Sequence, residues 1–138
     1  MKTTRFLVID DDPDNNMITK FALNKTPDKA EIKIFLIPEE ALEYIEKEYS
    51  QKEHLIPTVI LLDINMPTMS GWEFIEAFSK FPEKLKEHFI IYILSTSVDE
   101  RDKERADSNP IVSEYLEKPI TKETALRICS FNKVKINL

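Results

Sequence analysis

Five short runs of apolar and β-branched residues recur along the chain, separated by longer amphipathic segments. Runs 58–62 (TVILL) and 89–94 (FIIYIL) are almost uniformly apolar, which is typical of strands that are covered on both faces. The other three runs are 5–9 (RFLVI), 31–37 (EIKIFLI) and 112–117 (VSEYLE). The pattern therefore predicts five strands with helical segments between them.

The segments between the runs have the period of amphipathic helices, most weakly at 99–108. Pro13 fits the first position of the first helix, where no backbone N–H is needed, and Thr121 fits the N-cap of the last. The helical period places Ile18, Ala22 and Leu23 on the buried face of the first helix. The expected helices cover residues 14–25, 39–49, 72–80, 99–108 and 122–131.

Strand and helix alternate five times, which implies parallel pairing with right-handed crossovers. We therefore expect an α/β fold in which helices cover both faces of a parallel sheet, forming a three-layer sandwich. No repeat, low-complexity tract or Pro/Gly/Ser-rich linker interrupts the pattern. One domain is expected to span residues 1–138, with nothing attached to it.

The composition narrows the classes of function. The chain has 138 residues and a net charge of -6, which disfavours direct binding to nucleic acid or to an anionic membrane surface. A single cysteine, Cys129, excludes an internal disulfide, and His54 and His88 lack the spacing of a zinc site. There is no signal-peptide pattern and no apolar run long enough to span a membrane. We expect a cytoplasmic protein.

Polar residues follow the predicted strands at the end where ligands bind. The carboxyl ends of parallel strands open onto one edge of the sheet. Asp10 and Asp11 follow the first run, and Asp63 follows the third. Ser95 and Lys118 follow the fourth and the fifth. Three carboxylates, a hydroxyl and an ammonium group are therefore expected to converge.

Three carboxylates in a small area repel one another unless a cation is present. A hard divalent ion such as Mg²⁺ prefers oxygen ligands and needs only one or two direct carboxylates, whereas zinc and copper prefer His or Cys. Lys118 and Ser95 could contact two oxygens of an incoming phosphoryl group. Asp63 is then placed as a nucleophile that forms an aspartyl phosphate.

The acidic segment DDDPDN (10–15) also suggests a calcium loop, because its first, third and fifth positions are Asp. Such a loop needs Gly at its sixth position and Glu at its twelfth. Asn15 and Phe21 occupy these positions, which excludes the calcium loop. Asp12 and Asp14 are assigned instead to the start of the following helix, where negative charge is favourable.

Taken in order, the motifs VIDDDPDN, VILLDINMPTMSGWEF, ILSTS and YLEKPI resemble those of the receiver domain of two-component response regulators. The resemblance extends from about residue 5 to about residue 130. It implies a flavodoxin-like (βα)5 sandwich with the strand order 2-1-3-4-5. It also implies phosphorelay signalling, in which a histidine kinase or histidine phosphotransfer protein donates a phosphoryl group.

The resemblance assigns roles residue by residue. Asp63 matches the phosphoacceptor. Asp10 and Asp11 match the acidic pair that holds Mg²⁺ together with Asp63, with Asp11 as the direct ligand and Asp10 more often bound through water. Asn65 matches the residue whose backbone carbonyl completes the metal ligands. Lys118 matches the lysine that pairs with the phosphate.

Two further positions match the switch of the family. Ser95 matches the hydroxyl residue that moves toward the phosphate, and Tyr115 matches the aromatic residue that turns inward on activation. Thr96 narrows the space into which Tyr115 would turn. Pro119 follows Lys118 in a bond that is often cis in the family.

Some loop positions depart from the family pattern. Thr68 stands where the family usually has a glycine, whereas Gly71, the only glycine of the chain, matches a second family glycine. The glycine often found before the fifth strand is also missing, and we expect Asn109 to adopt the left-handed conformation there. These changes affect loop geometry and leave the chemical groups of the site intact.

The leading hypothesis is a stand-alone receiver that is phosphorylated on Asp63 and signals by conformational change to an unidentified downstream protein. We expect a monomer, or a weak dimer that forms on activation. A Mg²⁺-dependent phosphohydrolase would need a general acid two residues after the nucleophile, and Asn65 cannot serve. A phosphorylation-independent binding module is the other alternative. The joint presence of Asp11, Asp63, Ser95 and Lys118 argues against it.

Overall fold

Five parallel strands form one sheet in the order β2-β1-β3-β4-β5. The computed structural model describes residues 4–26, 30–51, 56–97 and 99–136, so that His54 lies outside the described residues. The flavodoxin-like α/β fold and the strand order expected from the sequence are both confirmed. The strands are β1 (Thr4–Ile9), β2 (Ala30–Phe35), β3 (Thr58–Leu62), β4 (Phe89–Ser95) and β5 (Val112–Glu117).

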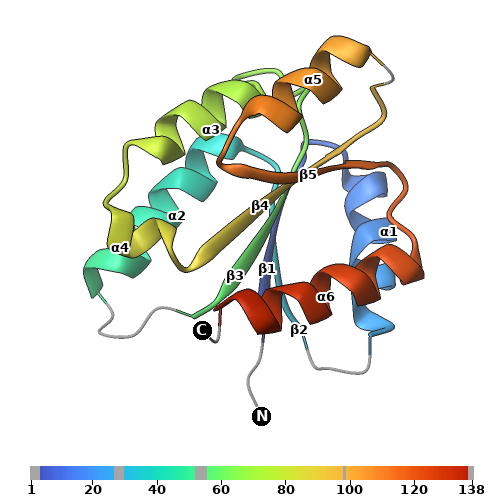
Figure 1. Cartoon of the computed structure of the whole chain (residues 1–138), viewed down its shortest axis with the longest axis horizontal. Coiled ribbons are helices and arrows are strands. Elements are labelled where there is room, and N and C mark those ends of the chain that lie inside the picture. The colour runs from blue at the N-terminus through green and yellow to red at the C-terminus, as the bar shows by residue number, and fades with distance from the viewer. Residues whose placement is uncertain (1–3, 27–29, 52–55, 98, 137–138) are drawn as a thin grey trace.

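The helices are α1 (Pro13–Asn24), α2 (Pro38–Gln51), α3 (Gly71–Ser79), α4 (Glu83–Lys86), α5 (Glu100–Ser108) and α6 (Lys122–Ile136). α1 and α6 lie on one face of the sheet, and α2, α3 and α5 lie on the other (Figure 1). Only α4 is not predicted from the sequence, because four residues are too few to show a helical period. None of the described helices has the length and apolar character needed to cross a bilayer.

The helix start signals are confirmed. Pro13 is the first residue of α1, and the side chain of Asp12 accepts a hydrogen bond from the N–H of Asp14 at 3.0 Å. Thr121 caps α6 by accepting a hydrogen bond from the N–H of Thr124 at 3.1 Å. Asp12 and Asp14 therefore belong to the start of α1, as expected.

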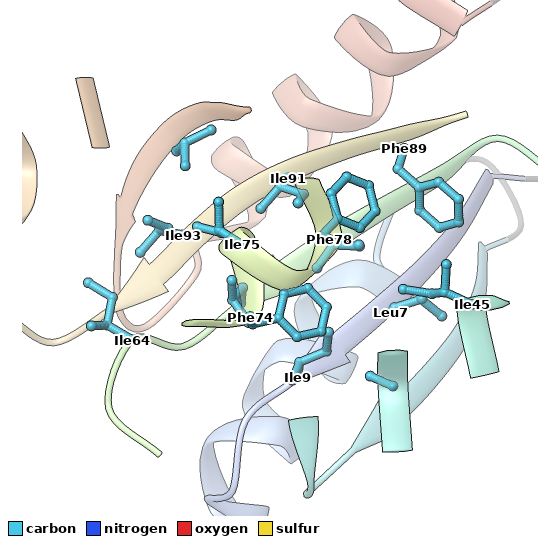
Figure 2. Packing of buried hydrophobic residues seen from close by; sticks show 14 of the residues in the cluster. Leu7, Ile9, Ile45, Ile64, Phe74, Ile75, Phe78, Phe89, Ile91 and Ile93 are labelled. Atoms are coloured by element: carbon cyan, nitrogen blue, oxygen red, sulfur yellow. The ribbon is translucent and has the colours of Figure 1, made fainter. Parts of the chain in front are cut away.

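The alternation of side chains along the central strands divides the core into two clusters. β1, β3 and β4 are buried along their whole length. Leu7, Ile9 and Ile91 point to the face that α2 and α3 cover. There they pack with Phe74 and Phe78 of α3 (Figure 2).

The intervening side chains point to the opposite face of the sheet. Phe6, Val8 and Tyr92 belong to a second cluster. This cluster also contains Leu23 of α1 and Ile128 of α6. Because both faces of the central strands bury apolar side chains, these strands appear in the sequence as continuous apolar runs.

The prediction that Ile18 lies on the buried face of α1 is wrong, because its side chain is 49% exposed. Ala22 and Leu23 are buried as predicted. In the first turns of α1 the buried positions include Asn15 and Asn16, whose side-chain amides donate hydrogen bonds to the end of the preceding strand. The buried face of α1 therefore follows these polar contacts rather than the apolar stripe.

The prediction of a left-handed conformation at Asn109 is also wrong. Its φ is -96°, and no described residue other than glycine has a positive φ. The Oδ1 atom of Asn109 accepts a hydrogen bond from the N–H of Ile111 at 2.9 Å, and its carbonyl accepts one from the N–H of Val112 at 3.1 Å. These two bonds form the turn with ordinary backbone angles.

A buried ion pair lies near the amino ends of the strands. Arg5 of β1 is 1% exposed, and its guanidinium pairs with the carboxylate of Glu48 on α2. It also donates to the hydroxyls of Tyr44 at 3.1 Å and Thr58 at 3.0 Å. Burial, followed by the hydrogen bond with Glu48, raises the pKa of Tyr44 to about 12. The cluster joins β1, β3 and α2 through polar contacts.

Candidate functional site

The three aspartates singled out in the sequence lie at the carboxyl ends of the adjacent strands β1 and β3. The N–H of Asp10 donates to the carbonyl of Phe35, and the N–H of Asp63 donates to the carbonyl of Ile9, both at 3.0 Å. The sheet therefore fixes the backbone of both aspartates. One carboxylate oxygen each from Asp10, Asp11 and Asp63 lies within 4.8 Å of the others.

The three carboxylates differ in their surroundings. Asp10 and Asp63 are buried, whereas Asp11 is exposed. Within the described part of the chain, no protein donor engages the carboxylate of Asp11. Oxygen donors of this kind suit a hard divalent cation, and Asp11 offers the carboxylate that is open to one.

Asp10 is held by three donors. Its Oδ1 accepts a hydrogen bond from the N–H of Asp12 at 3.0 Å. Its Oδ2 lies 2.8 Å from the side-chain amide of Asn15 and 2.7 Å from the ammonium of Lys118. Sequence reasoning misses Asn15. Its signal is an amide side chain in the first turn after a strand-end aspartate, where the helix turns the side chain back over the strand.

Lys118 links the two buried carboxylates. Its Nζ lies 2.7 Å from Oδ2 of Asp10 and 3.6 Å from Oδ1 of Asp63. The N–H of Lys118 donates to the carbonyl of Ser95 at 2.9 Å, which joins the ends of β4 and β5. The bond between Lys118 and Pro119 is cis, as the resemblance implies. One ammonium offsets only part of the charge of the neighbouring carboxylates.

The pKa of Asp63 is raised above its ordinary value of 3.8. The main cause is burial, which disfavours the charged form, and the charge of Asp10 adds to it. Attraction to Lys118 and backbone hydrogen bonds from Asn65 and Ile64 act in the opposite direction. The site therefore carries negative charge that its single lysine does not balance.

We expect Asp63→Asn to raise the free energy of unfolding at neutral pH in the absence of divalent cations. The pKa of Asp63 is higher in the folded state than in the unfolded state, so ionisation of this group costs stability as the pH rises. The gain should disappear below pH 3.8, the ordinary pKa, because the carboxyl is then protonated in both states. Urea unfolding in EDTA, from neutral pH to below pH 3.8, measures the difference in free energy of unfolding between Asp63→Asn and the wild type.

In Asp63→Asn, Lys118 should keep its contact with Asp10. Loss of the Asp63 charge therefore does not leave the ammonium group unpaired. Asp14→Asn is the control for removal of a carboxylate outside the site. Asp14 is exposed in the first turn of α1, where its charge is favourable, so this variant should lose a little stability rather than gain it. A loss of stability in Asp63→Asn at neutral pH would show that attraction to Lys118 outweighs burial and the charge of Asp10.

Three further predicted residues lie at or after the carboxyl ends of β3 and β4 or contact these segments. Ser95 is fully buried at the end of β4, and its Oγ accepts a hydrogen bond from the N–H of Ser97 at 3.1 Å. The hydroxyl of Tyr115 donates to the carbonyl of Ser97 at 2.7 Å. Asn65 is exposed in the loop after β3, two residues after Asp63. Ser97 therefore contacts both Ser95 and Tyr115.

Gly71 allows the start of α3 to approach the end of β3. A Cβ at this position would lie 2.5 Å from the carbonyl oxygen of Asp63 and 2.9 Å from the Cα of Ile64. The N–H of Gly71 donates to the carbonyl of Ile64 at 2.8 Å, which fixes the approach. The only glycine of the chain thus stands where any side chain would push against the backbone of Asp63.

We expect Gly71→Ala to lower the free energy of unfolding by about 1–3 kcal/mol, the usual cost of overpacking. Because the clash falls on the backbone of Asp63, the position of its carboxylate relative to Lys118 should change as well. Chemical denaturation measures the first effect, and the NMR signals of Asp63 and its neighbours report the second. Unchanged stability together with unchanged signals would show that the loop yields without cost.

Comparison with known proteins identifies one family. The family model of the response regulator receiver domain matches residues 6–129. A two-component response regulator from Cytophaga hutchinsonii is 28% identical, with a TM-score of 0.84 and 100% of each chain covered. A response regulator receiver protein from Dyadobacter fermentans is 25% identical, with a TM-score of 0.83, and the match covers 94% of this chain and 98% of that one.

The Mn²⁺-bound form of the response regulator Rcp1 has a TM-score of 0.72 at 24% identity, with 92% of each chain covered. This likeness shows the fold alone. A search of curated proteins gives no match.

Proposed function

Because the chain belongs to the response regulator receiver domain family, we propose that it accepts a phosphoryl group on Asp63 from a histidine kinase or histidine phosphotransfer protein. The observation that carries this proposal is the position of the Asp63 carboxylate, 3.6 Å from Lys118 and grouped with two further aspartates. Receiver domains are signalling modules. The proposed activity is therefore self-phosphorylation and autodephosphorylation rather than turnover of an external substrate.

We propose Mg²⁺ as the cation, held by Asp10, Asp11, Asp63 and the backbone carbonyl of Asn65. The oxygen-only donor set and the excess negative charge support a hard divalent ion. The structure of Rcp1, which shares the fold, holds Mn²⁺. When bound, such an ion supplies positive charge that stabilises the phosphoryl oxygens.

In this proposal an oxygen of Asp63 attacks the phosphorus of the donor in line. A phosphorus–oxygen bond forms, the bond between phosphorus and the donor nitrogen breaks, and its electrons leave with the imidazole. The ammonium of Lys118 lies beside Asp63 and pairs with a phosphoryl oxygen. The Oγ atom of Ser95 accepts a hydrogen bond from the N–H of Ser97. The hydroxyl hydrogen of Ser95 can therefore be donated to another phosphoryl oxygen.

The proposed signal passes through Ser97. If Ser95 moves toward the phosphate, its hydrogen bond with Ser97 changes, and the carbonyl of Ser97 is the acceptor for Tyr115. A turn of Tyr115 would then alter the surface formed by α5, β5 and α6, on which a downstream protein could discriminate the two states. We propose that residues 1–138 form one receiver domain whose output is contact with that protein.

Incubation with Mg²⁺ and acetyl phosphate, followed by intact mass measurement, tests the proposal. We expect a labile gain of one phosphoryl group in the wild type and none in Asp63→Asn. Asp14→Asn is the matched control and should be modified like the wild type, because it changes an exposed carboxylate outside the acidic group. Equal modification of Asp63→Asn would place the acceptor elsewhere.

The two alternatives give different results in the same experiment. A phosphohydrolase would turn over phosphate esters without a kinase, although Asn65 offers no acidic proton two residues after Asp63. A phosphorylation-independent binding module would show no modification with acetyl phosphate or with any histidine kinase. Either result would contradict the proposed function.

A further inference from the structure

β2 is one of the two edge strands of the sheet, and its backbone has a defined open side. The carbonyl of Phe35 accepts the N–H of Asp10, so the backbone groups of Phe35 point toward β1. Since these groups alternate in direction along a strand, those of Lys33 and Glu31 also point toward β1. Those of Ile32 and Ile34 point away from the sheet.

The same strand and the residues after it expose apolar side chains. Ile34 is 38% exposed, and Leu36 and Ile37, directly after β2, are 47% and 44% exposed. They are three of the six large apolar side chains exposed among the described residues. An exposed apolar edge strand is a template for pairing with another strand.

The charges on β2 match those of a second β2 strand that runs in the opposite direction. Glu31 and Lys33 are two residues apart on the face that carries α2, where Lys33 lies 5.1 Å from the ring of Tyr44. Neither forms an ion pair within the described part of the chain. A two-fold axis at Ile32 would place each Glu31 opposite the Lys33 of the second copy.

The opposite face of β2 is compatible with the same arrangement. A two-fold axis at Ile32 pairs Ile32 with itself and the small Ala30 with the larger Ile34, so this face becomes a continuous apolar surface. An axis at Lys33 would oppose two ammonium groups, and an axis at Ile34 would leave Lys33 opposite Phe35. Opposite-charge and apolar cross-strand pairs are stabilising, and like charges are not.

We propose that this protein forms a weak two-fold dimer by antiparallel pairing of β2 with β2 of a second copy, centred on Ile32. The pairing uses the outward backbone groups of Ile32 and Ile34 together with two Glu31–Lys33 pairs. It joins the two sheets into one and leaves the carboxyl ends with Asp63 uncovered. It therefore needs no phosphorylation, in contrast to a dimer formed on activation.

The other edge strand, β5, lacks these properties. Its only charged side chains are Glu114 and Glu117, and both are already ion-paired within the chain, with Arg127 and Lys103 respectively, so they offer no unpaired opposite charges to a second copy. Its pairing with β4 has a register irregularity at Ile91/Tyr92, and irregularities of this kind protect an edge from pairing. The pairing of β2 with β1 is regular over all six residues. Self-pairing is therefore specific to β2.

Sedimentation equilibrium of the unphosphorylated chain over a range of concentrations tests the dimer. We expect the mass to rise from 16.2 kDa toward twice that value. Lys33→Glu should weaken the dimer at least about tenfold, since it sets two acids opposite each other at two places. The charge exchange Glu31→Lys with Lys33→Glu should restore it. Asp63→Asn should dimerise like the wild type, which separates this test from that of the proposed function.

Backbone pairing and register have separate tests. Ile34→Pro removes an N–H that points away from β1, so it should abolish the dimer while circular dichroism shows an intact fold. Oxidation of Ile32→Cys should give a disulfide-linked dimer, because facing Cα atoms of such a pair are about 5.5 Å apart. The wild type, treated with the same oxidant, is the control for disulfides formed through the native Cys129.

Three results would overturn the proposal. They are a 16.2 kDa mass at every concentration, no recovery in the charge exchange, and cross-linking of Ile34→Cys but not of Ile32→Cys.

Discussion

Replacing Glu48 by alanine is expected to lower the free energy of unfolding by about 3–5 kcal/mol, because it leaves a buried charge without a counter-ion. Arg5 is 1% exposed, and its guanidinium is a cation. Its other hydrogen-bond partners among the described residues are the neutral hydroxyls of Tyr44 and Thr58. Hydroxyls cannot replace the charge of a carboxylate.

Urea denaturation measures this loss of stability. Two further variants serve as an exposed-pair control and as a test of rescue. Glu43→Ala removes an exposed ion pair with Lys47, in which both side chains are 67% exposed, and should cost less than about 1 kcal/mol. The double variant Arg5→Met with Glu48→Leu removes both charges and should recover most of the stability lost in Glu48→Ala. A loss in Glu48→Ala no larger than that in Glu43→Ala would mean that water reaches Arg5 when its partner is removed.

Asp11→Ala is expected to reduce Mg²⁺-dependent phosphorylation more than about 100-fold, since even partners of metal ligands cost 10–100-fold when removed. Asp10 already accepts hydrogen bonds from Asn15 and Asp12 and contacts Lys118. Within the described residues, Asp11 is the member of the acidic group whose carboxylate no protein group engages. A cation therefore loses its most accessible ligand in this variant.

Rates of phosphorylation by acetyl phosphate at increasing Mg²⁺ concentration measure this effect. Asp14→Ala is the matched control, because Asp14 is another exposed aspartate of the same segment but lies in the first turn of α1. We expect its rate and its Mg²⁺ dependence to equal those of the wild type. Equal losses in the two variants would point to the overall charge of the segment rather than to a ligand at Asp11.

Most of the fold can be predicted from the sequence because its signals are local and regular. Uniform apolar runs mark β3 and β4, and their alternating side chains supply both core clusters. The positions of Asp10, Asp63 and Lys118 follow from a general property of parallel sheets, since residues after each strand meet at one edge. The structure brings these three together, as expected.

The features missed by sequence reasoning depend on contacts between residues that lie far apart, or on polar burial. Arg5 and Glu48 are 43 residues apart. The sequence around each of them gives no sign that the two charges are buried together. The apolar character of Ile18 predicts that it lies on the buried face of α1, but that face instead carries Asn15 and Asn16, which donate hydrogen bonds to Asp10. The helical period is read from apolar side chains and contains no information about such hydrogen bonds.

Trp72 gives the molecule an optical property of its own. It is the only tryptophan of the chain, and the guanidinium of Arg105 on α5 lies 4.6 Å from its ring. A cation over the indole ring interacts with its π system, so we expect displacement of α5 to change the fluorescence emission of Trp72 on α3. The unlabelled protein would then report on the α5 surface without a dye, and Arg105→Ala is expected to remove that response.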